Sequence, residues 1–411
     1  MDWNGARSTL PGRVSLDALT LRIRDSNMEL QAVLEGVEIR FSIRDLLRRR
    51  FHATRVRVGR VTFRLRELMK NEDATPARLA NYPQIEGWPG PPVLGEFPPI
   101  PPEEDPWRIV VDGLTIARLA EIWIDSCRWT GNGRVEGSFE VFPGQRARIG
   151  PARLEVATGE VRRGDAIVVA RTTGSVRCEI PSFDTKVFTG NDVWKLLSGG
   201  ASLSGSFGGP AFLGAEVGGA RFSGGEGAIR VQVDLKDGSG TAVVRLTSRD
   251  VKARTATKTI RGTVVADVRV SGVDFKKGEA SLAGTSVVLS DVAVADSGKV
   301  DAWAATFHAR TGRFNLDDGS VDARMEGRIR DARPIVALMP PGLAKWAAGL
   351  LHLEDLEARC HITAAPSRFA IEALTVSSGN FSLDGYYRET GAVGRGRLHV
   401  KKGIFSVRFP I

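Results

Sequence analysis

The chain has 411 residues, of which 42% are hydrophobic and 26% are charged, a composition that is typical of a folded protein and excludes a disordered one. Its net charge of +9 is concentrated at one end, since the first 70 residues hold 15 Lys and Arg against 8 Asp and Glu. The 46 glycines and the low aromatic content of 7% favour a sheet with many tight turns over a helical protein, because interior glycine destabilises helices.

Several function classes are excluded at this level. No run of about 18 apolar residues is present, so the sequence predicts no membrane-spanning helix, and no signal peptide is visible. The three cysteines (Cys127, Cys178 and Cys360) have neither disulfide-framework nor zinc-site spacing, although a Cys127–Cys178 bridge stays an alternative. No nucleotide-binding, hydrolase or metalloprotease motif occurs, and the five histidines are scattered. We therefore expect no enzymatic activity, no cofactor and no metal.

Residues 1–82 are predicted to form an N-terminal β region with one short helix. Apolar and polar residues alternate along residues 19–24, 37–43 and 56–66, which indicates strands with one buried and one solvated face. Gly59 interrupts the third strand and predicts a bulge there. The residues expected to line the apolar face in this region are Ile39, Phe41, Val61 and Phe63.

A basic cluster interrupts this alternation. It consists of Arg44, Arg48, Arg49, Arg50 and Arg55, of which the first four lie in a predicted helical turn. Such a cluster suits contact with anionic phospholipid headgroups at a membrane surface. The alternative is a set of solvated strand exteriors. Nucleic-acid binding is not expected, because few aromatic residues interleave with the arginines.

Two connections and a middle region follow. Residues 83–106 contain 9 of the 20 prolines, so they predict an extended linker or a strap across the sheet and exclude a central strand. Alternation returns in the middle β region, residues 107–198, with turn signals every 8 to 14 residues. Residues 199–219 are rich in Gly and Ser and predict a second connection.

Residues 220–333 are predicted to continue the sheet. One strand places Ile229, Val231, Val233 and Leu235 on a common face, and the sequence DGSG after it predicts a hairpin turn. A later strand contributes Val268 and Val270. We assign these six residues to the same apolar lining as the N-terminal candidates.

The last region, residues 334–411, begins with a helical segment and ends in short strands. Leu343, Trp346, Leu350 and Leu351 recur at helical spacing, which predicts an amphipathic helix. This helix either packs as a cap on the end of the sheet or faces a membrane surface.

The chain therefore predicts a mainly β protein with about twenty strands, too many for one ordinary sheet. The strands are expected to form a long, curled antiparallel sheet, because native twist makes a long sheet coil. Its apolar face requires cover. Two arrangements meet that need: a sheet folded on itself around a packed core, or an open, taco-like groove whose concave face holds acyl chains.

Both ends of the chain resemble the AsmA-like family, which is related to the longer TamB-like proteins. The N-terminal resemblance rests on DLLRRRFHATRVRVGRVTFRLRE between strands in residues 36–67. The C-terminal resemblance rests on PPGLAKWAAGLLHLEDLEARCHI, FAIEALTVSSGNFSLDGYYRE and GRGRLHVKKGIFSVRF. Together these segments cover about a third of the chain.

The resemblance implies a repeating β-groove fold and a non-enzymatic role in lipid transport. A protein of this kind shields phospholipid acyl chains and contributes to outer-membrane biogenesis and lipid homeostasis. The resemblance implies a periplasmic location, associated with the inner membrane through an N-terminal helix that is absent from this chain. The expected partners are phospholipid, a membrane surface and other envelope proteins. The alternative is a structural or assembly factor of the cell envelope, with a packed β core that binds protein partners.

Overall fold

The computed structural model describes most of the chain. The described residues are 1–24, 27–95, 106–188, 190–208, 216–217, 220–254, 259–275, 277–294, 303–316, 318–333, 352–365, 368–390, 393–403 and 405–410. The protein is mainly β with few helices, and it divides into two compact units. Unit 1 comprises Met1–Gly205 and Leu235–Asp237, and unit 2 comprises Ser206–Asp234 and Gly238–Ile411.

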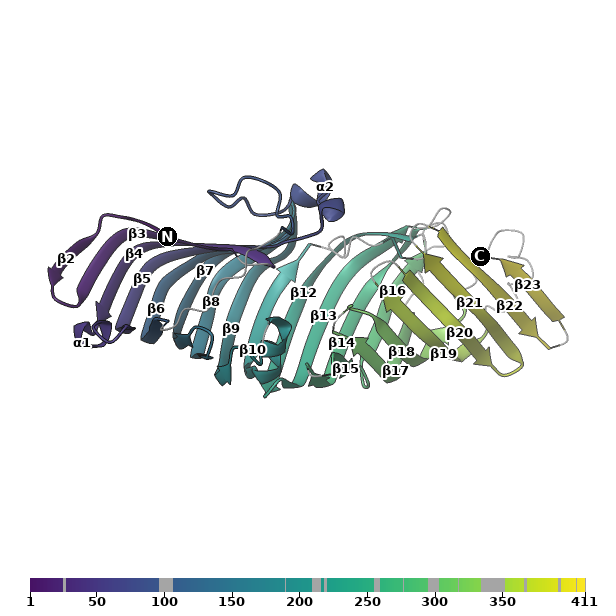
Figure 1. The fold of residues 1–411 in the computed structure, drawn as a ribbon. Helices are drawn as coiled ribbons and strands as arrows, with labels where there is room; N and C mark the ends of the chain where they lie inside the picture. The colour runs from purple at the N-terminus through teal and green to yellow at the C-terminus, as the bar shows by residue number, and fades with distance from the viewer. Residues whose placement is uncertain are drawn as a thin grey trace. The chain divides into compact units, whose positions relative to one another are not determined.

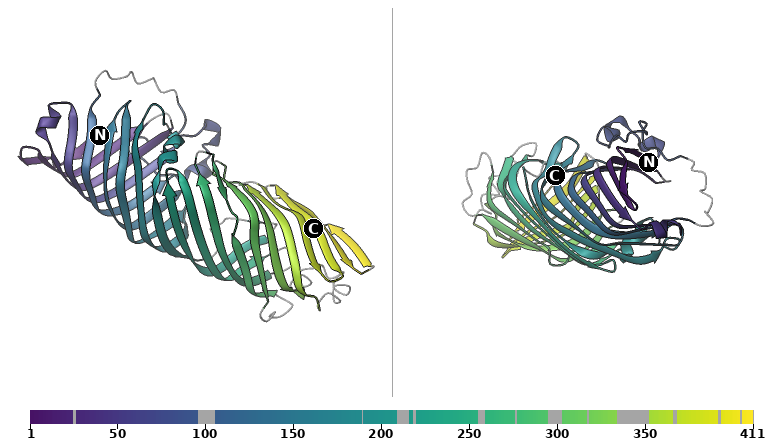
Figure 2. Two further views of the ribbon diagram at one scale, coloured as in Figure 1. Left: turned by 90° about the horizontal axis from the view of Figure 1, so that it is seen from below. Right: turned by 90° about the vertical axis from the view of Figure 1, so that its left-hand side faces the viewer.

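Unit 1 is a strongly curved sheet of long strands (Figures 1 and 2). The alternation of apolar and polar residues continues through strands of up to 19 residues, so each strand has two chemically different faces. The strands are β1 (Asp2–Asn4), β2 (Arg7–Leu10), β3 (Arg13–Arg24), β4 (Met28–Phe41), β5 (Arg50–Glu67), β6 (Arg108–Ile124), β7 (Cys127–Phe142), β8 (Arg146–Arg163), β9 (Ala166–Asp184) and β10 (Ser198–Phe207). The strand β10 lies in the Gly/Ser-rich segment. Its residues up to Gly205 belong to unit 1, and its last two residues, Ser206 and Phe207, belong to unit 2.

One pair of strands departs from the predicted antiparallel sheet. β5 and β6 pair in parallel, with Arg50 opposite Arg108 and Leu65 opposite Ile124. Because the two strands run in the same direction, the chain must return from the C-terminal end of β5 to its N-terminal end before β6 begins. This requires a crossover connection. Residues 68–107 connect the two strands, and the structure describes residues 68–95 and 106–107 of this crossover.

The helices of unit 1 are short and belong to the connections. The helix α1 (Ile43–Leu46) joins β4 to β5, and η1 (Asn71–Asp73) and α2 (Pro76–Leu79) lie in the crossover. The helix η2 (Gly190–Leu196) joins β9 to β10. In Figure 1, α1 lies at the lower ends of β4 and β5, and α2 lies at the opposite ends of the strands.

Gly36 and Gly59 change the side on which the apolar residues of β4 and β5 lie. The two glycines face each other in an unbroken register, so the bulge predicted at Gly59 is not present. Instead Gly36 has a φ of 63°, in the left-handed region that favours glycine. As a result Leu34 and Val37, three residues apart, both contact the same apolar cluster.

Unit 2 continues the pattern with shorter strands. They are β11 (Glu216–Val217), β12 (Ala220–Lys236), β13 (Ser239–Arg254), β14 (Thr259–Asp274), β15 (Glu279–Ser281), β16 (Ser286–Val294), β17 (Ala304–Asn315), β18 (Val321–Asp331), β19 (Glu354–Ala365), β20 (Arg368–Ser378), β21 (Phe381–Thr390), β22 (Val393–Lys402) and β23 (Phe405–Pro410). The last two residues of β12, Leu235 and Lys236, belong to unit 1. From β16 to β23, each successive strand pairs antiparallel with the next.

Candidate functional site

The two faces of the unit 1 sheet differ sharply in chemistry. We call one of them the apolar face of unit 1. It is formed by Leu34, Val37, Ile39, Val56, Val58, Val61, Leu114, Ile116, Leu119, Ile122, Trp129, Val135 and Leu154, from five consecutive strands. The four predicted lining residues of the N-terminal region lie on it. Ile39 and Val61 belong to this cluster, Phe41 follows Ile39 on the same side of β4, and Phe63 lies opposite Ile122.

Most of this face is only partly buried. Four of its side chains, including Val37 and Leu119, are less than 9% exposed, and the others are in intermediate positions. Toward the strand ends, further apolar side chains are more open: Ile109 is 36% exposed and Ile149 is 41% exposed. A second layer packed on the sheet would bury all of these side chains, so the pattern is that of a face without such a layer.

Trp129 lies flat across the middle of the apolar face. A Cβ atom built at Gly159 of β8 would lie 2.4 Å from the indole nitrogen, and one built at Gly131 would lie 2.7 Å from the ring. The indole N–H donates to the Thr172 hydroxyl on β9 at 3.2 Å. The glycines therefore leave room for the ring, and the hydrogen bond fixes it over three strands.

The opposite face, which we call the charged face of unit 1, is neutralised by ion pairs within and between strands. Arg60 contacts Glu35 at 2.6 Å, and Arg64 contacts Glu121 at 2.9 Å. Further pairs on this face join Arg128 to Glu121, Arg134 to Glu136, Arg153 to Glu155 and Arg162 to Glu160. Many of the charges on this face are therefore paired within the sheet.

The crossover packs on the charged face. Arg66 is 2% exposed, pairs with the equally buried Glu29 at 2.6 Å, and donates to the backbone oxygens of Pro83 and Trp88. Arg64 donates to the Gln84 oxygen at 3.0 Å. Since Arg64 and Arg66 alternate with Phe63 and Leu65 along β5, the crossover covers the side opposite the apolar face.

The predicted lining residues of β12 lie on one side of that strand, and those of β14 lie on one side of theirs. Ile229, Val231, Val233 and Leu235 are half-buried, whereas the intervening Arg230, Gln232 and Asp234 are exposed. Val268 lies opposite Val244, and Val270 lies opposite Ala242. Their strand partner residues are small and apolar, as expected for one continuous face on β13 and β14.

Another part of unit 2 is more deeply buried. One row of opposed residues runs across six strands through Phe307, Gly327, Ala358, Val376, Leu383 and Val400. Leu356 and Val400 have no exposed surface, and the Trp303 indole donates to the Asp331 backbone oxygen at 2.9 Å. This cluster has the burial of a packed core.

The predicted basic cluster lies at the turn between β4 and β5. We call residues 42–50 the arginine corner. Arg44, Arg48 and Arg49 are exposed at this corner, Arg50 is half-buried at the start of β5, and Arg55 is exposed further along that strand. Three of the five residues therefore lie in the tight turn at one end of the sheet, and two lie in the strand that follows it.

His52 ties the arginine corner to β6. Its two ring nitrogens lie 2.8 Å from the Asp45 carboxylate and 2.6 Å from the Asp112 carboxylate. Hydrogen bonds to Asp112 and then to Asp45 raise the pKa of His52 above its usual range, and the bond from His52 holds the pKa of Asp45 below its usual range. Sequence reasoning missed this bridge, because its members lie 7 and 60 residues apart.

The predicted cap or membrane-facing helix is not placed. Leu343, Trp346, Leu350 and Leu351 lie outside the described residues.

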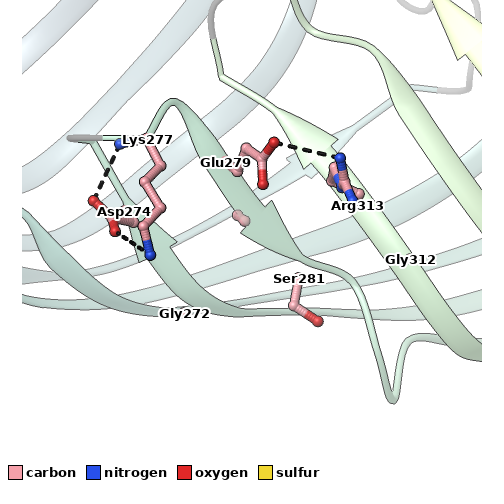
Figure 3. Close-up of a pocket in the computed structure, with 8 residues that line it drawn as sticks. Gly272, Asp274, Lys277, Glu279, Ser281, Gly312 and Arg313 are labelled. Atoms are coloured by element: carbon pink, nitrogen blue, oxygen red, sulfur yellow. Dashed lines mark hydrogen bonds and ion pairs between the residues drawn. The ribbon is translucent and has the colours of Figure 1, made fainter.

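Unit 2 also contains a polar depression of about 260 Å³ between β14, β15 and β17. Its charges are paired with one another, Asp274 with Lys277 at 3.5 Å and Glu279 with Arg313 at 3.4 Å (Figure 3). Satisfied pairs leave little to attract a ligand, so the apolar faces are the stronger candidates.

In the part of the chain that the structure describes, no helix is long and apolar enough to cross a membrane, and no group of three or more His, Cys, Asp or Glu residues is arranged to hold a metal ion. The three cysteines are unpaired. Neither a family model, nor a curated protein, nor a solved structure matches this chain.

Proposed function

We propose that this protein binds phospholipids by their acyl chains on the apolar face of unit 1 and on the half-buried apolar face of unit 2, and moves them between membranes of the cell envelope without making or breaking bonds. In this proposal it works in the periplasm, at a membrane surface and with other envelope proteins. The AsmA-like resemblance of both chain ends supports the same function.

One observation carries the proposal. The described residues of the crossover pack on the charged face, and the apolar face is only partly buried. A soluble protein rarely exposes an apolar patch of more than a few hundred Å² unless the patch binds something. An acyl chain offers only methylene and methyl groups, so it removes this surface from water without needing polar partners.

Native mass spectrometry of the full chain, purified without detergent from a bacterial host, tests the proposal. We expect co-purified phospholipid on the wild type and its loss in Ile122→Asp, which places a charge in the middle of the apolar face. Thr115→Asp is the matched control, because it makes the same kind of change on the same strand, opposite Arg57 and Glu136 on the charged face. A folded wild type that carries no phospholipid and takes none up from vesicles would contradict the proposal.

The buried row of unit 2 favours a second reading for that region, a packed core in a structural or assembly factor. Substitutions within unit 2 distinguish a lipid-binding face from a packed core. Val231→Asp should keep the fold and lower lipid binding, whereas Leu356→Asp should unfold the unit, as circular dichroism would show. If Val231→Asp also unfolds the protein, the face on β12 is core and not a lipid site.

A further inference from the structure

The arginine corner exposes apolar side chains at a tight turn. Leu47 is 84% exposed and Ile43 is 43% exposed, and between and beside them lie the exposed Arg44, Arg48 and Arg49. Turns at the ends of strands are ordinarily polar, since their side chains meet water. The exposure of Leu47 among arginines is therefore unusual for a turn that only connects two strands.

The corner is held in one shape by its own contacts. The Ser42 hydroxyl accepts from the Asp45 N–H at 3.2 Å, and the Leu46 and Leu47 N–H groups donate to the Ser42 and Ile43 oxygens. Asp45 points back toward His52, which is also bound to Asp112. The corner's single carboxylate is thus engaged within the protein, and the charges left facing outward belong to arginines.

Two of these arginines carry a charge that no described carboxylate neutralises. Several arginines along the strands of unit 1 do pair with glutamates, for example Arg60 with Glu35 and Arg153 with Glu155. Arg44 and Arg48 form no ion pair with a described residue. A guanidinium group binds phosphate oxygens in a bidentate manner, so unpaired arginines around an exposed leucine match the headgroups and outer acyl region of an anionic bilayer.

Two neighbouring turns extend this surface. The Phe41 N–H donates to the Gly12 oxygen, which joins the corner to the β2–β3 turn, where Leu10 is 59% exposed. The Arg108 N–H donates to the Arg49 oxygen at 3.0 Å, which joins the corner to Trp107, itself 43% exposed. Three chain segments therefore present apolar side chains at one edge of unit 1.

We propose that this edge, formed by the arginine corner with Leu10 and Trp107, docks unit 1 onto an anionic phospholipid bilayer. Leu47 and Trp107 enter the boundary between headgroups and acyl chains, while Arg44 and Arg48 bind lipid phosphates. The inference goes beyond acyl-chain binding, because the edge binds a bilayer surface whether or not the apolar face holds a lipid. Phe41 and Ile109 lie near the same strand ends, so docking brings the end of the apolar face to the membrane.

Co-sedimentation of the full chain with vesicles tests the docking. Vesicles of phosphatidylcholine alone are compared with vesicles that also contain phosphatidylglycerol, at low and high NaCl. We expect the wild type to sediment with the anionic vesicles and less so at high salt, because salt screens the arginine–phosphate attraction. Leu47→Asp and the double variant Arg44→Glu/Arg48→Glu should each lower the apparent affinity at least about tenfold.

The matched control is Arg118→Glu/Arg177→Glu, which changes the net charge equally at exposed arginines within β6 and β9. It should bind anionic vesicles nearly as well as the wild type, and all variants should keep the wild-type circular dichroism spectrum. An equal loss in the control would show attraction by net charge alone and overturn the proposal. The proposal would also be overturned if the folded wild type did not bind anionic vesicles, or if it bound single-stranded DNA and not the vesicles. Vesicle binding by a protein that carries no lipid in native mass spectrometry would refute acyl-chain binding but leave the docking intact.

Discussion

At the scale of single residues, the most informative contacts are polar ones placed at the edges of apolar surfaces. His52 sits between two carboxylates and fixes the arginine corner, and Arg66 with Glu29 is buried under the crossover. Trp129 rests on glycines in the middle of the apolar face. Each of these residues positions a larger element, so its replacement has effects beyond the lost contact.

The His52 bridge predicts a pH dependence of stability. Because its pKa is raised in the folded protein, the bridge contributes fully below the ordinary histidine pKa of about 6.5 and loses its contribution as the pH rises through the raised value. Urea unfolding at a series of pH values should show the wild type losing stability relative to His52→Gln as the pH rises above about 6.5 and through the raised pKa. Parallel pH profiles for the two proteins would contradict the role given to the bridge.

The glycines under Trp129 predict a steric effect. A Cβ atom at Gly159 would lie 2.4 Å from the indole nitrogen and 2.9 Å from the Thr130 backbone oxygen, so Gly159→Val must displace the ring or the strand. We expect a loss of about 1–3 kcal/mol in the free energy of unfolding, as for overpacked sites. Gly90→Val is the control, since a Cβ there meets nothing within 4 Å and Gly90 has no positive φ. Equal losses in the two variants would show that the ring contact is unimportant.

At the scale of elements, the crossover is the feature that sets the two faces of unit 1 apart. It brings β6 parallel to β5 and packs on the charged face through Arg66, Arg64 and Trp123, whose indole N–H donates to the Asn81 oxygen at 3.3 Å. The described residues of the connection are therefore a structural part of the unit, and their contacts lie on the charged side of the sheet.

The Arg66–Glu29 pair should anchor the crossover. Arg66→Met leaves the Glu29 carboxylate buried beside Arg24 alone, and we expect a loss of about 3–5 kcal/mol in the free energy of unfolding. The double variant Glu29→Met/Arg66→Met should recover part of that loss, because no buried charge then lacks its partner. Limited proteolysis within residues 68–95 gives a second readout, with faster cleavage expected in the single variant. Unchanged stability and cleavage in Arg66→Met would show that the crossover is held by other contacts.

Much of the sheet could be predicted from the sequence, because period-two alternation reports directly which side chains share a face. Ile229, Val231 and Val233 are half-buried between exposed neighbours, as the pattern predicts. The parallel pairing of β5 and β6 could not be predicted this way, since alternation is the same in parallel and antiparallel strands. The signal that was available is length: about 40 residues separate the two strands, far more than a hairpin needs.

The candidate site was predictable only in part, for a related reason. Alternation identified Ile39 and Phe41 as residues of the apolar face, but it cannot tell whether a second layer covers them. It also missed the change of side at Gly36, which depends on a left-handed backbone conformation and not on any apolar residue. The exposure of Leu47 was invisible because the sequence LLRRR is equally suited to a packed helical turn.

At the scale of the whole molecule, both units repeat one design in which a sheet carries charged residues on one side and apolar residues on the other. In unit 1 the apolar side is partly exposed, and in unit 2 it is half-buried on β12 and β14 and more deeply buried from β17 to β22. The function that we propose for these apolar surfaces is to shield acyl chains from water without making or breaking bonds.

The measurement that tests this account most directly is site-specific photo-crosslinking in cells. A photoreactive phenylalanine analogue is placed at Ile122 or Val135 on the apolar face, and at Thr115 or Glu136 on the charged face of the same two strands. Mass spectrometry of the purified full chain after irradiation then detects covalent phospholipid. The account predicts phospholipid adducts at Ile122 and Val135 and none at Thr115 and Glu136. Adducts at all four positions, or at none of them in a folded protein, would contradict it.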